Sequence, residues 1–109
     1  MERDEGLEAI LNDDLAGTRG LTQKAMFGGL AWLVNGNLLC GARAGSMLIR
    51  LGKGNDGWAL KIPGVVPMVM QGRTMSGWLR ASPEVYSDDA LRKKLLRTAL
   101  EFNRTLPKK

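Results

Sequence analysis

Residues 24–42 read KAMFGGLAWLVNGNLLCGA, and this stretch decides the fold of the chain. At its centre the pair Asn35-Gly36 separates two apolar runs, Leu30–Val34 and Asn37–Ala42. Asparagine and glycine tolerate a positive φ better than other residues, so the pair predicts a two-residue type I′ turn and therefore a β-hairpin. Both strands carry apolar residues on both faces, which predicts that they lie in the middle of a sheet.

The two-residue turn also sets the pairing between the two strands. The expected pairs are Val34 with Asn37, Leu33 with Leu38, and Trp32 with Leu39. Just upstream, Gly28-Gly29 suits a bulge or a sharp bend, because glycine has no Cβ atom. We therefore expect the chain to bend as it enters the hairpin.

Two helices and four further strands are predicted around the hairpin. Apolar residues recur at helical spacing over residues 5–15, and again in a last helix that Ser87 caps and that runs to Pro107. The further strands are expected at residues 22–27, 46–51, 65–70 and 75–81. Pro67 gives the strand at 65–70 an edge position or an irregular start. The turns between residues 22 and 51 are too short for parallel crossovers, so these strands run antiparallel.

These elements predict a single α+β domain over residues 1–109. We expect two layers: a curved, mostly antiparallel sheet of five to six strands, with the N-terminal and C-terminal helices packed on one face. A chain of this length buries a core without disulfides or metals. Cys40 lies inside an apolar strand and is expected to be a small buried hydrophobe.

Composition excludes several kinds of site. The chain has no histidine and one cysteine, so it lacks the commonest general base and cannot form an ordinary zinc site. Neither a nucleophile elbow nor a pair of catalytic carboxylates is found. We therefore predict no catalytic, cofactor-binding or metal-binding residues, and a protein that is not an enzyme. No signal peptide or membrane-spanning run is visible, which predicts a cytoplasmic, bacterial-style protein without a membrane partner.

Residues 52–57, GKGNDG, match the pattern G-x-G-x-x-G of dinucleotide-binding loops. A dinucleotide site also needs a long helix after the loop and an acidic residue about 20 positions further on. Here Pro63 stops a short helical segment at 58–62, and no acid lies between Asp56 and Glu84. The loop is therefore interpreted as a flexible glycine-rich connection.

Charge is unevenly distributed along the chain. Residues 1–17 hold six acids and one base, whereas residues 18–109 hold fifteen bases and five acids. Such asymmetry is typical of proteins with a nucleic-acid or acidic partner. It is equally consistent with an acidic N-terminal helix that packs near a basic face of its own domain.

The last helix carries a basic face opposite its apolar stripe. We name this face the basic ridge, and its members are Lys93, Arg97, Arg104 and Lys108. A ridge of this kind binds phosphate groups or an acidic partner, unless it is an ordinary solvated face interrupted by Glu101. Binding of nucleic acid would be independent of base sequence, because no helix-turn-helix, zinc finger or aromatic RNA-binding signature is present.

Six methionines leave room for one exposed apolar patch besides those that pack in the core. An apolar, exposed sheet face around Met68, Met70 and Met75 would favour a protein partner. A polar sheet face with a continuous basic ridge would favour nucleic acid instead.

A series of short motifs resembles the TfoX/Sxy N-terminal domain family. MFGG at 26–29 is followed by an apolar strand, the Asn35-Gly36 turn and a second strand, and the similarity continues from Met47–Arg50 to RTLP at 104–107. It covers nearly the whole chain, which is expected to be a short stand-alone member without the C-terminal domain of full-length regulators. The motif residues, which are expected to be structural, are Met26, Phe27, Gly28, Gly29, Asn35, Gly36, Pro67, Met68, Gly72, Arg73, Gly77 and Trp78.

The resemblance implies a curved antiparallel sheet with flanking helices. It also implies kinship with bacterial regulators of competence, which act with a transcription activator at certain promoters. We therefore expect a non-enzymatic regulatory or protein-interaction module with a protein partner, for which the transcription machinery is a candidate. The alternatives are sequence-independent nucleic-acid binding through the basic ridge, and a small-ligand binder or enzyme with a pocket on the sheet. Assembly as a homodimer is also left open.

Overall fold

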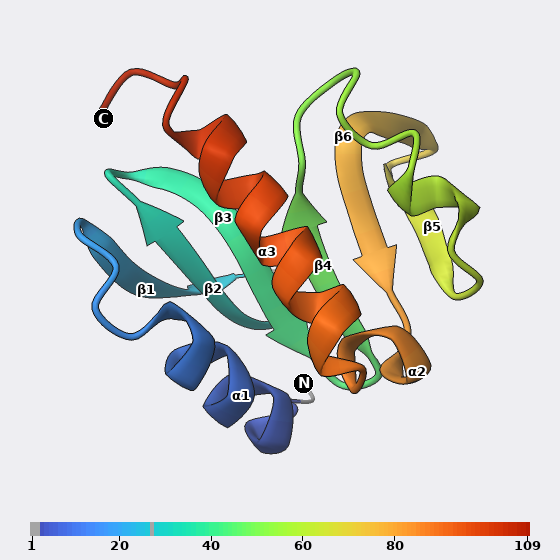
Figure 1. Ribbon diagram of the computed structural model, residues 1–109, viewed down its shortest axis with the longest axis horizontal. Helices are drawn as coiled ribbons and strands as arrows, with labels where there is room; N and C mark the ends of the chain where they lie inside the picture. The colour runs from blue at the N-terminus through green and yellow to red at the C-terminus, as the bar shows by residue number, and fades with distance from the viewer. Residues whose placement is uncertain (1–2, 27) are drawn as a thin grey trace.

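The computed structural model describes residues 3–26 and 28–109, which form an antiparallel six-stranded sheet and a layer of helices (Figure 1). The predicted α+β class is confirmed, and the strand order across the sheet is β1-β2-β3-β4-β6-β5. The strands are β1 (Leu21–Met26), β2 (Gly29–Val34), β3 (Asn37–Arg43), β4 (Ser46–Arg50), β5 (Val65–Met70) and β6 (Arg73–Ala81). The helices are α1 (Glu5–Leu15), the 3-10 helix η1 (Ala59–Lys61), α2 (Pro83–Tyr86) and α3 (Asp89–Asn103).

The two long helices, α1 and α3, lie on the same side of the sheet, and α3 runs across β3 and β4 (Figure 1). The core fills the space between these layers, where Leu11, Trp32 and Leu95 are completely buried. Burial of apolar surface of this kind is the main stabilising contribution to folding. None of the described helices packs against the other side of the sheet, which we name the open face.

The hairpin of β2 and β3 forms as predicted at its turn. Asn35 and Gly36 have φ angles of 54° and 81°, as a type I′ turn requires. The pairs Val34 with Asn37 and Leu33 with Leu38 are confirmed. The third expected pair is wrong, because Trp32 pairs with Cys40 and a β-bulge lies between it and the turn. The bulge lets the consecutive residues Leu39 and Cys40 both join the core cluster, which regular alternation would prevent by turning one of them to the other face.

The C-terminal helix begins and ends at other residues than expected. Asp88 is the N-cap in place of Ser87, since its side-chain Oδ1 accepts a hydrogen bond from the backbone N–H of Leu91 at 3.1 Å. Ser87 instead ends the short helix α2, which begins with Pro83 at its first position and was not predicted. Proline suits that position because its missing N–H would have no partner inside the helix.

The last six residues, 104–109, leave the helix and turn back to the hairpin. Asn37 Nδ2 donates to the carbonyl oxygen of Pro107 at 2.8 Å, and the backbone N–H of Lys109 donates to the carbonyl oxygen of Asn35 at 2.9 Å. Asn103 adds a bond from its Nδ2 to the carbonyl oxygen of Asn37 at 3.4 Å. These bonds take the place of further helical turns, which is why α3 stops at Asn103 rather than at Pro107.

The remaining strands agree with the predictions within a few residues. β1 and β6 each begin earlier than expected, and the expected end of β1 at Phe27 lies outside the described residues. β5 is an edge strand, as Pro67 indicated, and it has a bulge between Pro67 and Val69. Both devices are typical of edge strands that resist pairing with another chain.

Candidate interaction surfaces

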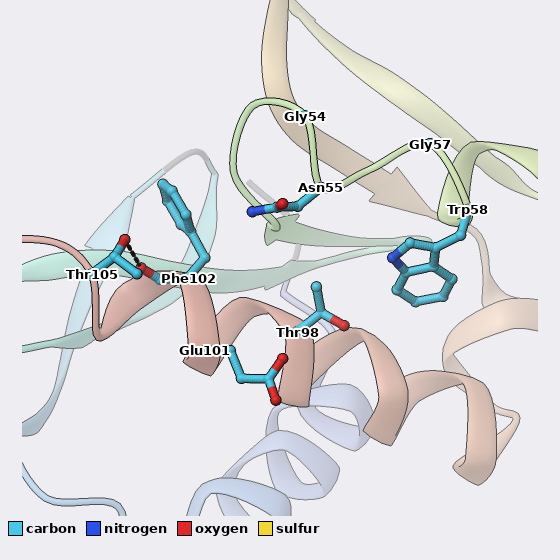
Figure 2. Close-up of a pocket in the computed structure, with 8 residues that line it drawn as sticks. All are labelled: Gly54, Asn55, Gly57, Trp58, Thr98, Glu101, Phe102 and Thr105. Atoms are coloured by element: carbon cyan, nitrogen blue, oxygen red, sulfur yellow. Dashed lines mark hydrogen bonds between the residues drawn. The ribbon is translucent and has the colours of Figure 1, made fainter.

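A groove of about 850 Å³ lies between the glycine-rich loop and α3 (Figure 2). Figure 2 shows Asn55 and Trp58 on the loop side, opposite Thr98, Glu101 and Phe102 of the helix. The groove was not predicted, although an aromatic residue directly after the glycine loop was a signal for it. Its lining is completed by Gly54, Gly57 and Thr105.

Three polar side chains of this groove are hydrogen-bonded within the protein itself. Thr98 Oγ1 donates to the carbonyl oxygen of Lys94 at 3.0 Å, and Thr105 Oγ1 donates to that of Phe102 at 2.6 Å. Asn55 Nδ2 donates to the carbonyl oxygen of Leu51 at 3.2 Å. Glu101 is the one carboxylate among the lining residues, and no basic residue lines the groove. The lining side chains therefore provide neither an acid–base pair nor a cation that could bind a phosphate group.

A second groove, of about 520 Å³, separates the end of α1 from α3. Three members of the basic ridge, Lys93, Arg97 and Arg104, line it and are exposed, whereas Lys108 lies in the tail beyond the helix. The groove is also lined by the acids Asp13, Asp14 and Glu101. Positive and negative groups thus share one surface, which weakens the attraction of this ridge for a phosphate backbone.

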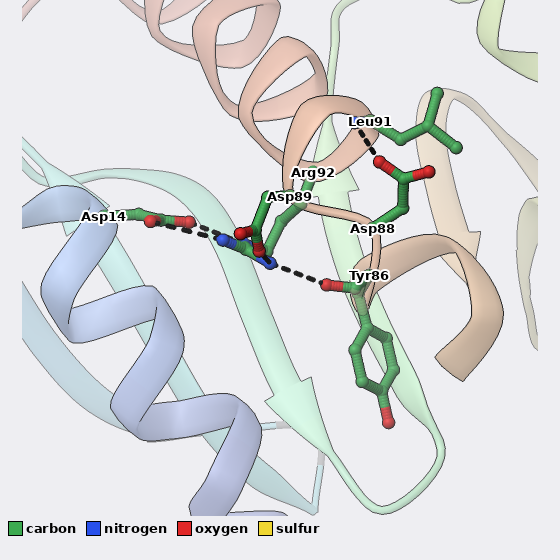
Figure 3. Close-up of polar contacts among 6 residues, drawn as sticks. All are labelled: Asp14, Tyr86, Asp88, Asp89, Leu91 and Arg92. Atoms are coloured by element: carbon green, nitrogen blue, oxygen red, sulfur yellow. Dashed lines mark hydrogen bonds and ion pairs between the residues drawn. The ribbon is translucent and has the colours of Figure 1, made fainter.

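An ion-pair network joins α1 to α3 next to this groove (Figure 3). Arg92 is 3% exposed, and its Nε lies 2.6 Å from Oδ2 of Asp14 while its Nη1 lies 2.9 Å from Oδ1 of Asp89. The same Nη1 donates to the carbonyl oxygen of Tyr86 at 3.0 Å. Hydrogen bonding to Asp14 is the main reason why the pKa of Arg92 is raised. The acidic helix therefore does pack against basic residues of its own domain, which was one of the two expected explanations of the charge asymmetry.

One row of paired residues, followed across all six strands, gives the composition of the open face. The row is Lys24, Ala31, Gly41, Leu48, Arg80 and Val66. It faces away from the helices, because the neighbours Met47, Ala42 and Ala81 belong to the core and side chains alternate along a strand. Leu48 is 4% exposed, so this face contains buried apolar surface although none of the described helices covers it.

Arg80 stands at the centre of the outer part of this face. Its Nε donates to Oγ of the buried Ser46 at 3.2 Å, which fixes the direction of the guanidinium group. A hollow of about 150 Å³ lies on one side of it, which we name the apolar hollow, and it is lined by Arg43, Leu48, Met68, Val69, Met70 and Arg80. A shallower hollow of about 360 Å³ lies on the other side and includes Ser46, Val66 and Ser82.

The exposed apolar residues of this region differ from those expected. Val66, Val69 and Met70 of β5 are 52%, 56% and 38% exposed. Met70 was expected in such a patch, but Met68 is 5% exposed and Met75 is half-buried. The bulge next to Met68 breaks the alternation that the prediction assumed, so Val69 takes the exposed place.

Every charged residue in the described strands is basic. These residues are Lys24, Arg43, Arg50, Arg73 and Arg80. The acids among the described residues lie in helices, at their caps or in loops. Arg43 and Arg80 are half-buried, and neither forms an ion pair with any residue in the described ranges. Sequence reasoning missed both arginines, although the lack of acids in all predicted strands was a readable signal.

Three residues of the TfoX-like motifs, Gly29, Gly77 and Trp78, make close contacts within the fold. A Cβ atom on Gly29 would lie 2.0 Å from the carbonyl oxygen of Ala42, so only glycine fits beside β3. Gly77 has a φ of 82°, and a Cβ atom there would lie 2.4 Å from the backbone carbonyl carbon of Gly52. Trp78 packs under the guanidinium group of Arg50, 5.0 Å from its ring centre. Phe27 lies outside the described residues.

Other kinds of site find little support in the described residues. Cys40 is buried, and burial raises the pKa of its thiol far above the ordinary value. Among residues 3–26 and 28–109, no three histidine, cysteine or acidic side chains gather where they could hold a metal ion. The helices of the same ranges are too short or too polar to span a membrane.

Comparison with known proteins gives one match. The family model described as the TfoX N-terminal domain matches residues 13–103, which is most of the chain. No curated protein and no solved structure matches the chain.

Proposed function

We propose that this chain, which belongs to the TfoX N-terminal domain family, is a regulatory domain that binds a partner protein and catalyses no reaction. Family membership supports the regulatory role. Because the regulators of this family act with a transcription activator, a protein of the transcription machinery in the bacterial cytoplasm is the proposed partner. The binding surface that we propose is the outer part of the open face, from β5 to Arg43.

The observation that carries this proposal is the exposed apolar surface of β5. Val66 and Val69 are each more than half exposed, and both border hollows that contain Arg80. Exposed apolar side chains that surround a hollow and are flanked by arginine are typical of protein interfaces. Neither helix-side groove combines such apolar exposure with free polar groups.

The proposal can be tested by placing a photo-crosslinking amino acid at Val69 in the full chain. We expect a discrete adduct with one protein in extracts of bacterial cells, and no such adduct from the same group at Ala9, which is exposed on α1. An excess of chain without the crosslinker should reduce the amount of adduct, because it competes for the partner. The double variant Val66→Asp, Val69→Asp should not reduce it, provided that its circular dichroism spectrum shows an unchanged fold. Identical adducts from both positions would contradict the proposal, and a self-adduct would assign the surface to a homodimer.

Binding of nucleic acid through the basic ridge is the second candidate function. It is favoured by the exposure of Lys93, Arg97 and Arg104, which form no ion pair with other residues in the described part of the chain. The acids that line the same groove oppose it. A salt series with duplex DNA distinguishes the two candidates, because phosphate contacts weaken steeply as the salt concentration rises.

A further inference from the structure

We infer that the segment bound at the open face is an acidic, extended peptide segment of the partner, which inserts one large apolar side chain into the apolar hollow and pairs its carboxylates with Arg43 and Arg80. This inference rests on the proposed function and adds the chemistry of the partner to it. It follows from the size of the hollow, the position of the two arginines and the charges around them.

The size of the apolar hollow fits one side chain. Its volume is about 150 Å³, and its apolar lining comes from Leu48 and from Met68, Val69 and Met70 of β5. An apolar cavity of about this volume is large enough for a benzene ring. A leucine, methionine or phenylalanine side chain of a partner would therefore fill it and remove exposed parts of Val69 and Met70 from water.

The two arginines at this hollow lack acidic partners within the described residues. Arg43 is on β3 and Arg80 is on β6, with β4 between them. Arg43 pairs with Ser46 and Arg80 pairs with Leu48, so their backbones lie two strand spacings apart across the sheet and two residues apart along it, about 12 Å in all. Side chains alternate along an extended chain, which advances about 3.3 Å per residue, so acids two positions before and two positions after one apolar residue share its face and lie about 13 Å apart, close enough to reach both guanidinium groups. Arg80 is held in place by Ser46, which lowers the entropy that it loses on pairing.

Charge distinguishes this partner from a second copy of the chain. The strands present only basic charged residues, so two open faces brought together would place arginine against arginine. Strand addition at the edge is also opposed, because Pro67 lacks an N–H donor and β5 has a bulge. Nucleic acid would supply negative charge but no flexible apolar side chain for the hollow. An acidic segment that binds through its side chains matches both the positive charge of the open face and the shape of the apolar hollow.

The test uses the full chain, labelled with ¹⁵N, and three synthetic peptides. The first, GSEDLDESG, contains one leucine between acids, the second replaces its acids by amides (GSQNLNQSG), and the third replaces its leucine by alanine (GSEDADESG). We expect the first peptide to shift the amide resonances of Arg43, Leu48, Val69 and Arg80. The two control peptides should bind about tenfold more weakly, which is the loss that one charged hydrogen bond or one buried side chain produces.

Variants of the chain show whether the arginines are responsible. Arg43→Gln and Arg80→Gln should each weaken binding of the acidic peptide, whereas Arg97→Gln, which changes the same charge on α3, should not. Equal binding of acidic and amide peptides, or no shift on the open face at millimolar peptide, would overturn the inference. It would also be overturned if a single-stranded oligonucleotide shifted these resonances at lower concentration, or if they shifted with protein concentration alone.

The two proposals fail in different ways. If the crosslinker at position 69 captures a partner through a segment that is not acidic, the proposed function stands and the inference is wrong. If the acidic peptide binds as described but no protein is captured at position 69, the chemistry of the surface is correct and the proposed function is wrong.

Discussion

Replacing Asp14 by alanine removes one half of the ion pair that joins α1 to α3. The side chains of Arg92 and Asp14 are 4% and 11% exposed, and their closest atoms are 2.6 Å apart. Removing one partner of a buried pair costs about 3–5 kcal/mol, because the other charge stays buried without compensation. Arg92 keeps its contacts with Asp89 and the carbonyl oxygen of Tyr86, so we expect the lower end, about 3 kcal/mol.

Such a loss is large for a domain of this size, whose free energy of unfolding is about 5–15 kcal/mol. Urea unfolding followed by circular dichroism should show a lower midpoint with an unchanged slope. The melting temperature should fall by about 12 °C or more. Asp13→Ala is the matched control, because Asp13 is the exposed neighbour of Asp14 and forms no ion pair in the described structure, and its effect should stay within about 0.5 kcal/mol.

Asp89→Ala provides a second comparison within the same network. Asp89 also contacts Arg92, but its side chain is 79% exposed, so its loss should cost less than about 1 kcal/mol. The reasoning would be refuted if Asp14→Ala cost less than about 1 kcal/mol, or if Asp89→Ala cost as much as Asp14→Ala. Either result would show that burial does not determine the strength of these pairs.

Three further predictions concern other parts of the structure. Hydrogen bonds from Arg3 to Glu8 lower the pKa of Glu8, so an NMR titration should give a value below the ordinary one, and Arg3→Gln should raise it. The stabilisation by this pair is then present above the unfolded-state pKa of Glu8 and is lost as the pH falls through its folded-state pKa, where the stabilities of the two proteins should converge. Gly29→Ala should cost about 3 kcal/mol in urea unfolding because of the overlap with Ala42, whereas Gly57→Ala, which meets no atom within 4 Å, should be nearly neutral. The double variant Arg97→Glu, Arg104→Glu should leave any binding of duplex DNA at low salt unchanged, because acids share the groove of the basic ridge. Fluorescence anisotropy measures this binding. If the double variant loses a salt-dependent complex that the unchanged chain forms, the result favours the nucleic-acid function instead.

The sequence predicts those features of the fold that neighbouring residues determine. The turn at Asn35-Gly36 depends on the backbone of two residues, and it forms as expected. The edge position of β5 follows from one proline. The bulge that pairs Trp32 with Cys40 could not be predicted, because it depends on how many side chains the helix layer buries. The choice of Asp88 over Ser87 as N-cap depends on α2, which needs the tertiary structure to form.

The candidate surface is harder to predict than the fold. Arg43 and Leu48 lie on consecutive paired strands, but Arg80 becomes their neighbour only because β6 pairs with β4, although β5 lies between those two strands in the sequence. No periodic pattern along one strand reports such a pairing. The basic ridge was visible because helical spacing places its residues together, but the acids of α1 that share its groove come from a distant part of the sequence.

The bonds between the tail and the hairpin turn decide where a tether can be attached. The chain ends on the side of the sheet that holds the turn, far from β5 at the opposite edge (Figure 1). A surface linker or a fluorescent dye joined to Lys109 therefore leaves the open face at β5 accessible to solution. A chain immobilised through Lys109 would present β5 to a partner in solution. A tether at Gly72, in the turn between β5 and β6, would obstruct access to β5.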